Sequence, residues 1–144
     1  MRESAAASSA CAAAIGSISA AAKTKTSFAI NAAAVTALHS AGIYTDEDYG
    51  DAVRYLESEY DDVSRHSGTH FYFWYGNYYA AQAFRQCGGE RWQRYWKRLV
   101  GDLLSRQQSD GRWRNDVGPG DEFATAMACL MLQIPDSVLP IFQR

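Results

Sequence analysis

The chain has 144 residues, of which 47% are hydrophobic and 13% are aromatic, so it is long enough to form one domain with a substantial core. Its 14 basic and 16 acidic residues leave a formal net charge of −2, which excludes a strongly basic nucleic-acid-binding protein and a chain kept disordered by its own charge. The widely spaced Cys11, Cys87 and Cys129 indicate neither a disulfide framework nor a zinc knuckle.

The first 26 residues are rich in alanine and serine. The run from Ala5 to Ala22 contains almost no Leu, Val or Phe, so it is too weakly apolar for a membrane span or the core of a signal peptide. We expect residues 1–26 to form a marginal helix or a disordered segment, and residues 27–144 to form a repeat domain. These features favour a cytoplasmic location.

From residue 27 onward, small apolar segments alternate with longer amphipathic ones, which predicts an all-α fold. Helix ends are marked by Gly42 as a C-cap, by Thr45 and Asp48 as a capping box, and by Gly88 and Gly89 as a stop. We expect helices over residues 28–41, 71–84, 91–106 and 123–134, and another that begins at residue 45 and ends before residue 64. Loops are expected at 64–69, 109–111 and 115–120.

The chain also shows an internal repeat. Leu56 and Leu103 are 47 residues apart, and so are Gly42 and Gly89. Each period holds one helix rich in small residues and one amphipathic helix with its charges outside. Because such a pair cannot bury its own apolar face, it has to stack on neighbouring pairs. We therefore expect the alanine-rich helices to form an inner layer and the charged helices an outer layer.

A short motif closes the amphipathic helix 91–106. Gln107, Gly111 and Trp113 form a Gln-x3-Gly-x-Trp pattern, which Arg98 and Leu103 precede. Gly111 suits a turn with positive φ. The Gln107 amide can satisfy unpaired carbonyl and N–H groups at helix ends, with Trp113 lying on that amide. The motif is therefore expected to tie outer helices together, and it says nothing direct about catalysis.

These five residues resemble the QW motif of the squalene–hopene cyclase and protein prenyltransferase superfamily, which includes the oxidosqualene cyclases. Leu99 and Asp102 depart from the motif, which usually has glycine and an aromatic residue there. The resemblance covers residues 27–144 and is to the C-terminal part of such proteins. It implies an α/α toroid of helical hairpins, of which this chain holds about three, or half a ring. Two copies in a homodimer would complete the ring.

The catalytic groups of that superfamily are not recognisable here. The DxDD motif of squalene cyclases is absent, and the nearest acidic run, Asp46 to Asp48, is typical of a solvated helix start. Cys87, His66 and His70 do not have the spacing of a zinc site. We therefore predict no cofactor and no metal. Three alternatives stay open: a domain that binds an isoprenoid or a partner, half of a cyclase-like isomerase or prenyltransferase, and a non-enzymatic helical scaffold.

Seven aromatic residues fall within residues 70–79, at the start of the second inner helix. In cyclases of this kind, aromatic rings on the inner wall stabilise cations and shape an apolar chain. The alternative is that the rings fill the core, with tyrosine hydroxyls reaching a polar edge. The candidate wall residues for an apolar ligand are Phe71, Phe73, Trp74, Tyr75, Tyr78 and Tyr79.

Basic residues are concentrated on the polar side of the helix expected over 91–106. They are Arg91, Arg94, Lys97 and Arg98. We interpret them as a solvated face, with peripheral contact to a membrane surface as the alternative. Binding to nucleic acid is not expected.

Overall fold

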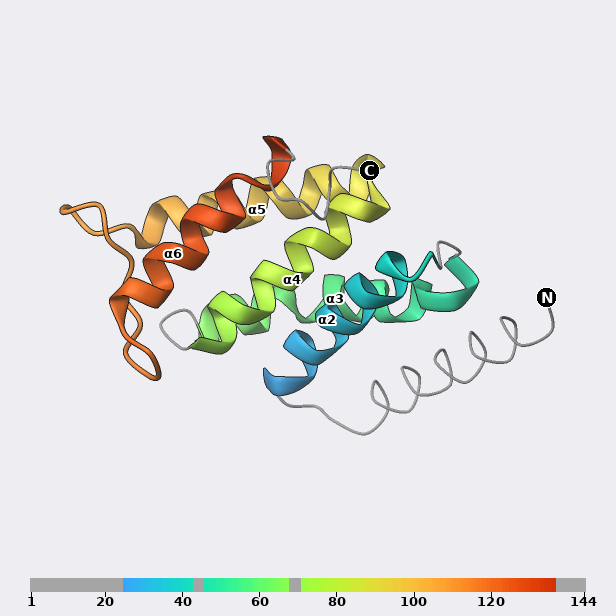
Figure 1. The fold of residues 1–144 in the computed structure, drawn as a ribbon, viewed down its shortest axis with the longest axis horizontal. Coiled ribbons are helices and arrows are strands. Elements are labelled where there is room, and N and C mark those ends of the chain that lie inside the picture. Colours follow the sequence, from blue (N-terminus) through green and yellow to red (C-terminus); the bar gives the residue numbers. More distant parts are fainter. Residues whose placement is uncertain (1–24, 43–45, 68–70, 137–144) are drawn as a thin grey trace.

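The structure is a computed structural model that describes residues 25–42, 46–67 and 71–136. These ranges form five α-helices and one short 3-10 helix, and no strand, so the all-α prediction is confirmed for this part of the chain (Figure 1). Most of the predicted alanine-rich segment lies outside the described residues. The elements are α2 (Lys25–Ser40), α3 (Asp46–Ser67), α4 (Phe71–Cys87), α5 (Gly89–Arg106), α6 (Asp121–Leu132) and η1 (Ile134–Asp136).

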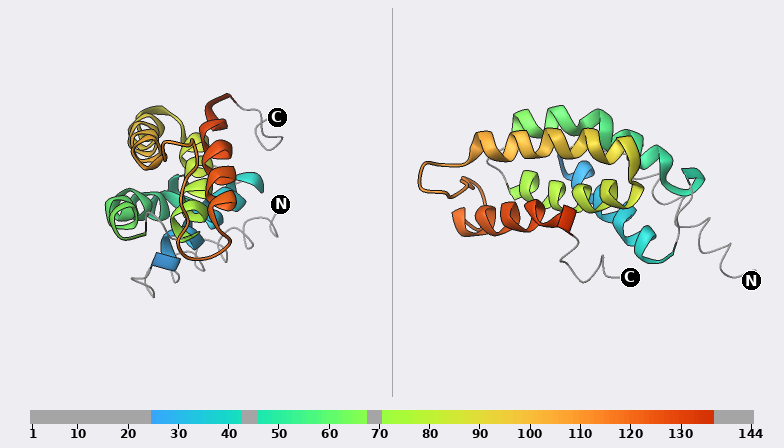
Figure 2. Two further views of the ribbon diagram at one scale, coloured as in Figure 1. Left: turned by 90° about the vertical axis from the view of Figure 1, so that its left-hand side faces the viewer. Right: turned by 90° about the horizontal axis from the view of Figure 1, so that it is seen from above.

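The helices form two layers, with α4 at the centre. The amphipathic helices α3 and α5 lie side by side in one layer, and the helices rich in small residues, α2, α4 and α6, make up the other (Figure 2). α4 is flanked by α2 and α6 and also packs against α3 and α5. Its position explains why its buried residues include three alanines, since small side chains let neighbouring helices approach closely.

Successive outer helices run in the same direction. Glu57 on α3 lies near Arg94 on α5, and one turn further along both helices Asp61 pairs with Arg98. The two partners advance together, so α3 and α5 are parallel. A simple up-and-down bundle, by contrast, makes neighbouring helices antiparallel.

The ends of α2 and α4 show the same 47-residue spacing as the glycine pair in the sequence. α2 ends at Ser40 and α4 at Cys87, which is 47 residues later. Glycines follow both ends: Gly42 has a φ of 87°, and Gly88 and Gly89 have φ values of 68° and 54°. This left-handed conformation stops a helix and favours glycine, so the two predicted stop signals are confirmed.

The predicted loop at 64–69 was wrong for its first four residues, because α3 continues to Ser67. The segment is polar, but the Ser64 hydroxyl donates to the Asp102 carboxylate and the Ser64 carbonyl accepts from Arg106, so contacts with α5 hold it helical. Smaller differences occur elsewhere: α2 spans 25–40, α4 extends to 87, α5 begins at 89, and α6 spans 121–132, with 134–136 in a 3-10 turn.

The core sits between the two layers, and its tightest point is the contact of α2 with α4. Gly76 on α4 faces Phe28 and Ala29 on α2. A Cβ atom added to Gly76 would stand 3.0 Å from Cδ1 of the buried Phe28 ring. Further along this interface, the Thr36 hydroxyl donates to the Tyr79 carbonyl over 3.1 Å. Glycine at position 76 therefore sets how closely α2 and α4 pack.

We expect Gly76→Ala to lower the free energy of unfolding by about 1 kcal/mol, although alanine is the better helix former, because the methyl group displaces the Phe28 ring. Gly101→Ala is the matched control: it also lies within a helix, but nothing stands within 4 Å of the added Cβ. It should raise the free energy of unfolding by up to about 1 kcal/mol. Urea unfolding followed by circular dichroism measures both variants. Equal stabilisation by the two substitutions would contradict the close approach.

Candidate functional site

Trp113 holds the turn that follows α5. Its ring is only 4% exposed, and its indole Nε1 donates a hydrogen bond of 2.7 Å to the Leu103 carbonyl. That carbonyl belongs to the last turn of α5, where carbonyl groups have no partner within the helix. The Trp113 backbone N–H also donates to the Thr125 hydroxyl on α6, over 3.2 Å. A single residue thus joins the end of α5 to α6.

Gln107 has a different role from the one predicted. Its amide Nε2 donates to the Gly111 carbonyl over 3.0 Å, which closes the turn itself and leaves the helix end to Trp113. The difference follows burial: Gln107 is exposed and can bond to water, whereas the Trp113 indole N–H is buried and is satisfied by the carbonyl at the helix end. Gly111 has a φ of 86°, as the turn requires.

The other two residues of the motif lie elsewhere. The Arg98 guanidinium lies over the Tyr60 ring, 4.5 Å from its centroid, and pairs with Asp61. Leu103 is fully buried in the core. The motif residues therefore lie in three places: the turn, the core and the contact between α3 and α5. They do not form one site.

Asp102 is the main polar link between the outer helices, and it enters the sequence analysis only as a departure from the motif. Its carboxylate accepts hydrogen bonds from the Tyr60 hydroxyl, over 2.8 Å, and from the Ser64 hydroxyl. Arg106 adds a bond of 2.7 Å to the Ser64 carbonyl. One signal for this role was available: Asp102 follows the buried Leu99 by three residues, a spacing that puts both on nearly the same side of a helix.

Two buried tyrosines stand beside this network. Burial raises the pKa of Tyr60, and the hydrogen bond to Asp102 raises it further. Burial also raises the pKa of Tyr95 well above its usual value, and its hydroxyl donates to Oδ1 of Asn77 over 2.8 Å. The two rings meet edge to face with centroids 5.4 Å apart. Both hydroxyls therefore stay protonated and act as hydrogen-bond donors at neutral pH.

Some residues of the predicted aromatic wall are buried in the core, and others reach the surface. Phe73 and Trp74 are fully buried and meet edge to face, with ring centroids 5.0 Å apart. These two rings fill the core and offer no surface to a ligand. The side chain of Phe71 lies outside the described part of the structure.

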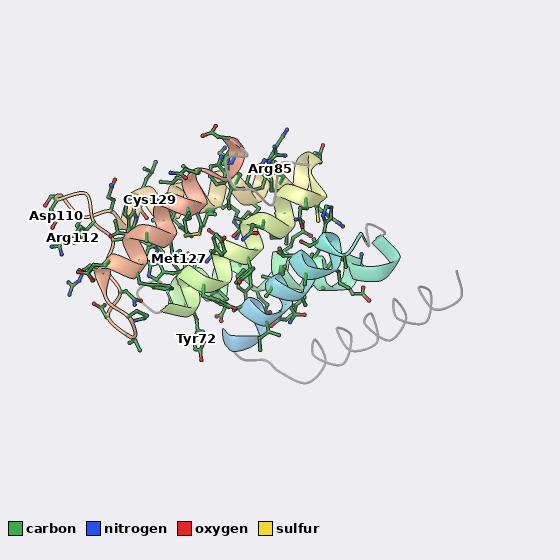
Figure 3. All side chains as sticks on the ribbon, viewed as in Figure 1. Tyr72, Arg85, Asp110, Arg112, Met127 and Cys129 are labelled. Atoms are coloured by element: carbon green, nitrogen blue, oxygen red, sulfur yellow. The ribbon has the colours of Figure 1, made fainter. Side chains whose placement is uncertain are left out.

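The remaining wall residues, Tyr75, Tyr78 and Tyr79, form what we call the tyrosine cluster. Tyr75 is 40% exposed, and the other two are half-buried. The Tyr79 ring centroid lies 4.9 Å from that of Tyr75 and 5.2 Å from that of Tyr78. The half-buried Tyr72 extends from the first turn of the same helix (Figure 3). All three belong to α4, where Tyr78 and Tyr79 also pack against the core.

The four predicted basic residues of α5 line a groove between α3 and α5, called here the outer groove, with a volume of about 920 Å³. From the sequence these residues were expected on a solvated face. The groove itself could not be predicted there, because its second wall belongs to α3, about forty residues earlier in the chain. The outer groove and the tyrosine cluster thus lie on different layers of the fold (Figure 2).

Within the described ranges, no group of three or more His, Cys, Asp or Glu side chains is placed to hold a metal ion. Cys87 is half-buried, while the side chains of His66 and His70 and of the acidic run at 46–48 lie outside the description. None of the described helices combines the length and apolar character needed to cross a membrane. Comparison of the chain with family models, with curated proteins and with solved structures found no match.

Trp113→Phe should lower the free energy of unfolding by about 1–2 kcal/mol, because it removes the N–H that satisfies the buried Leu103 carbonyl. Trp113→Ala should cost about 3–5 kcal/mol, since it also removes a buried ring. Gln107→Ala serves as the control in the same turn and should cost less than about 1 kcal/mol, because Gln107 is exposed. Thermal unfolding measures all three. An unchanged melting temperature for Trp113→Ala would rule out the role given to this ring.

We expect the free energy of unfolding to fall as the pH rises above 10, the ordinary tyrosine pKa. Above that pH, tyrosines ionise in the unfolded chain, while the raised pKa of Tyr60 and of Tyr95 keeps both protonated in the folded chain. Their contribution to stability is therefore complete below pH 10 and is lost progressively above it. Urea unfolding at several values between about pH 8 and 11 should show a shallower decline for Tyr60→Phe. The same decline in both proteins would refute this assignment.

Proposed function

We propose that this chain is a helical-hairpin repeat domain of the α/α-toroid type, similar to squalene–hopene cyclases and protein prenyltransferases, and that the tyrosine cluster binds an apolar isoprenoid chain. The observation that carries the proposal is the exposure of aromatic rings on the central helix, where Tyr75 is 40% exposed beside Tyr78 and Tyr79. Covering such rings with an apolar ligand removes their surface from water, which is favourable.

The arrangement of the helices supports the architectural part of the proposal. Each helix rich in small residues is followed by an amphipathic helix in the other layer, and α3 and α5 run parallel, as successive outer helices of stacked hairpins do. Trp113 then connects the end of an outer helix to the following inner helix, α6. This is the place where the QW motif is expected to tie repeats together.

The chemistry of the cluster supports binding and not catalysis by these three residues. Protonation of a carbon–carbon double bond needs a strong acid. Burial raises the pKa of Tyr79, and its hydrogen bond with Tyr75 raises it further, which makes the Tyr79 hydroxyl a weaker acid than an ordinary tyrosine. The rings instead offer π faces and edges to branched apolar groups. We therefore assign the cluster a ligand-binding role.

The test is a titration of the full chain with farnesol, followed by the fluorescence of its aromatic residues. Tyr75→Ala should weaken binding about tenfold, which corresponds to about 1.4 kcal/mol of lost contact. Leu104→Ala is the matched control, because Leu104 is 59% exposed on the outer helix α5, and it should leave the affinity unchanged. Equal weakening by both substitutions, or the absence of saturable binding, would contradict the proposal.

A further inference from the structure

We infer that the outer groove is a second binding site, which takes an extended acidic peptide segment of a partner. The groove lies between α3 and α5, whereas the tyrosine cluster belongs to α4, which lies in the other layer. The inference rests on the shape and charge of the outer layer alone, so it does not depend on the function proposed for the cluster.

Both α3 and α5 pack on α4, but their backbones make few contacts with each other. Side chains join the two helices, and the outer groove is the space left between them. Tyr60 and Ser64 reach Asp102 at one end. Along the α5 wall, Gly101 has no side chain, and the space where one would stand is empty to 4 Å. A volume of about 920 Å³ lies within the size of clefts that bind ligands. The floor is closed by the buried ring of Tyr95.

The charges that line the outer groove favour an anionic ligand. Its cationic residues are Arg65, Arg91, Arg94, Lys97 and Arg98, and its anionic residues are Glu57, Asp61 and Asp102. Asp102 is already engaged by two hydroxyl groups. Glu57 lies between Arg91 and Arg94 at 3.8 Å and 3.5 Å, which are long contacts. Among the described residues, Lys97 forms no hydrogen bond or ion pair.

The ion pairs already present in the outer groove do not close it to a ligand. Arg94 is 62% exposed, and exposed ion pairs contribute little free energy because water solvates both partners well. A carboxylate from a ligand can therefore replace Glu57 at Arg94 at small cost. Arginine suits this exchange, since its planar guanidinium binds a carboxylate through two parallel hydrogen bonds.

The spacing of the basic residues favours a peptide over a compact polyanion. Arg94 and Arg98 are one helical turn apart, about 6 Å along the axis, close to the distance of about 7 Å between alternate side chains of an extended peptide. A dense phosphate group would also bring its charges near Glu57 and Asp61, which line the same groove. A peptide spaces its charges, and its backbone N–H groups can donate to those carboxylates.

The experiment titrates the full chain with three probes: a short peptide that alternates glutamate and serine, its lysine counterpart, and inorganic pyrophosphate. Binding is followed by the shifts of backbone amide signals in heteronuclear NMR. We expect saturable shifts with the glutamate peptide at Arg94, Lys97 and Gly101, at least threefold weaker binding after Arg94→Gln or Lys97→Gln, and no saturable shifts with the lysine peptide.

The matched control is Arg54→Gln. Arg54 is a cation on α3 with 60% side-chain exposure, against 62% for Arg94, and it pairs with Asp51 away from the groove. It should leave the affinity for the glutamate peptide unchanged. Equal weakening by Arg54→Gln and Arg94→Gln would show attraction by net charge alone and overturn the site. Absence of binding to the glutamate peptide, or tighter binding of pyrophosphate, would also overturn it.

Discussion

The packing of α4 against four other helices is the constraint on which the rest of the structure depends. Gly76 makes room for the Phe28 ring from α2. The buried Ala80, Ala81 and Ala83 have small side chains that let neighbouring helices approach α4 closely. Small side chains allow close approach where they lie, and large buried rings on the same helix fill the space elsewhere, because interiors are packed to the density of crystals. The same helix carries the tyrosine cluster, in which Tyr75 is exposed and the other two rings are half-buried.

The same constraint produces the outer groove. Since α3 and α5 both rest on α4, their spacing is set by the helix beneath them, and long polar side chains span the space that remains. Tyr60 and Asp102 close it at one end with a part-buried hydrogen bond, which is better protected from water than the exposed ion pairs along the rim. The domain thus presents an aromatic surface on one layer and a charged, hollow surface on the other.

Much of the helical architecture was predictable from local pattern, because periodicity and glycine act over a few residues. The stops at Gly42 and at Gly88–Gly89 were correct, since glycine has no Cβ and adopts positive φ without steric cost. The loop predicted at 64–69 failed because Ser64 is held helical by α5, nearly forty residues away. Gln107 and Trp113 marked the right turn, but which side chain reached the helix end depended on burial.

By itself, the sequence determined the order and type of the helices, the 47-residue period, and the division into small-residue and amphipathic segments, because these follow from composition and spacing along the chain. Only the tertiary structure decided which rings of the aromatic block are buried and which are exposed. It also decided that the basic side of α5 forms one wall of a groove. Both outcomes depend on which helices lie against α4 and α5, and that is settled by contacts between residues distant in the chain.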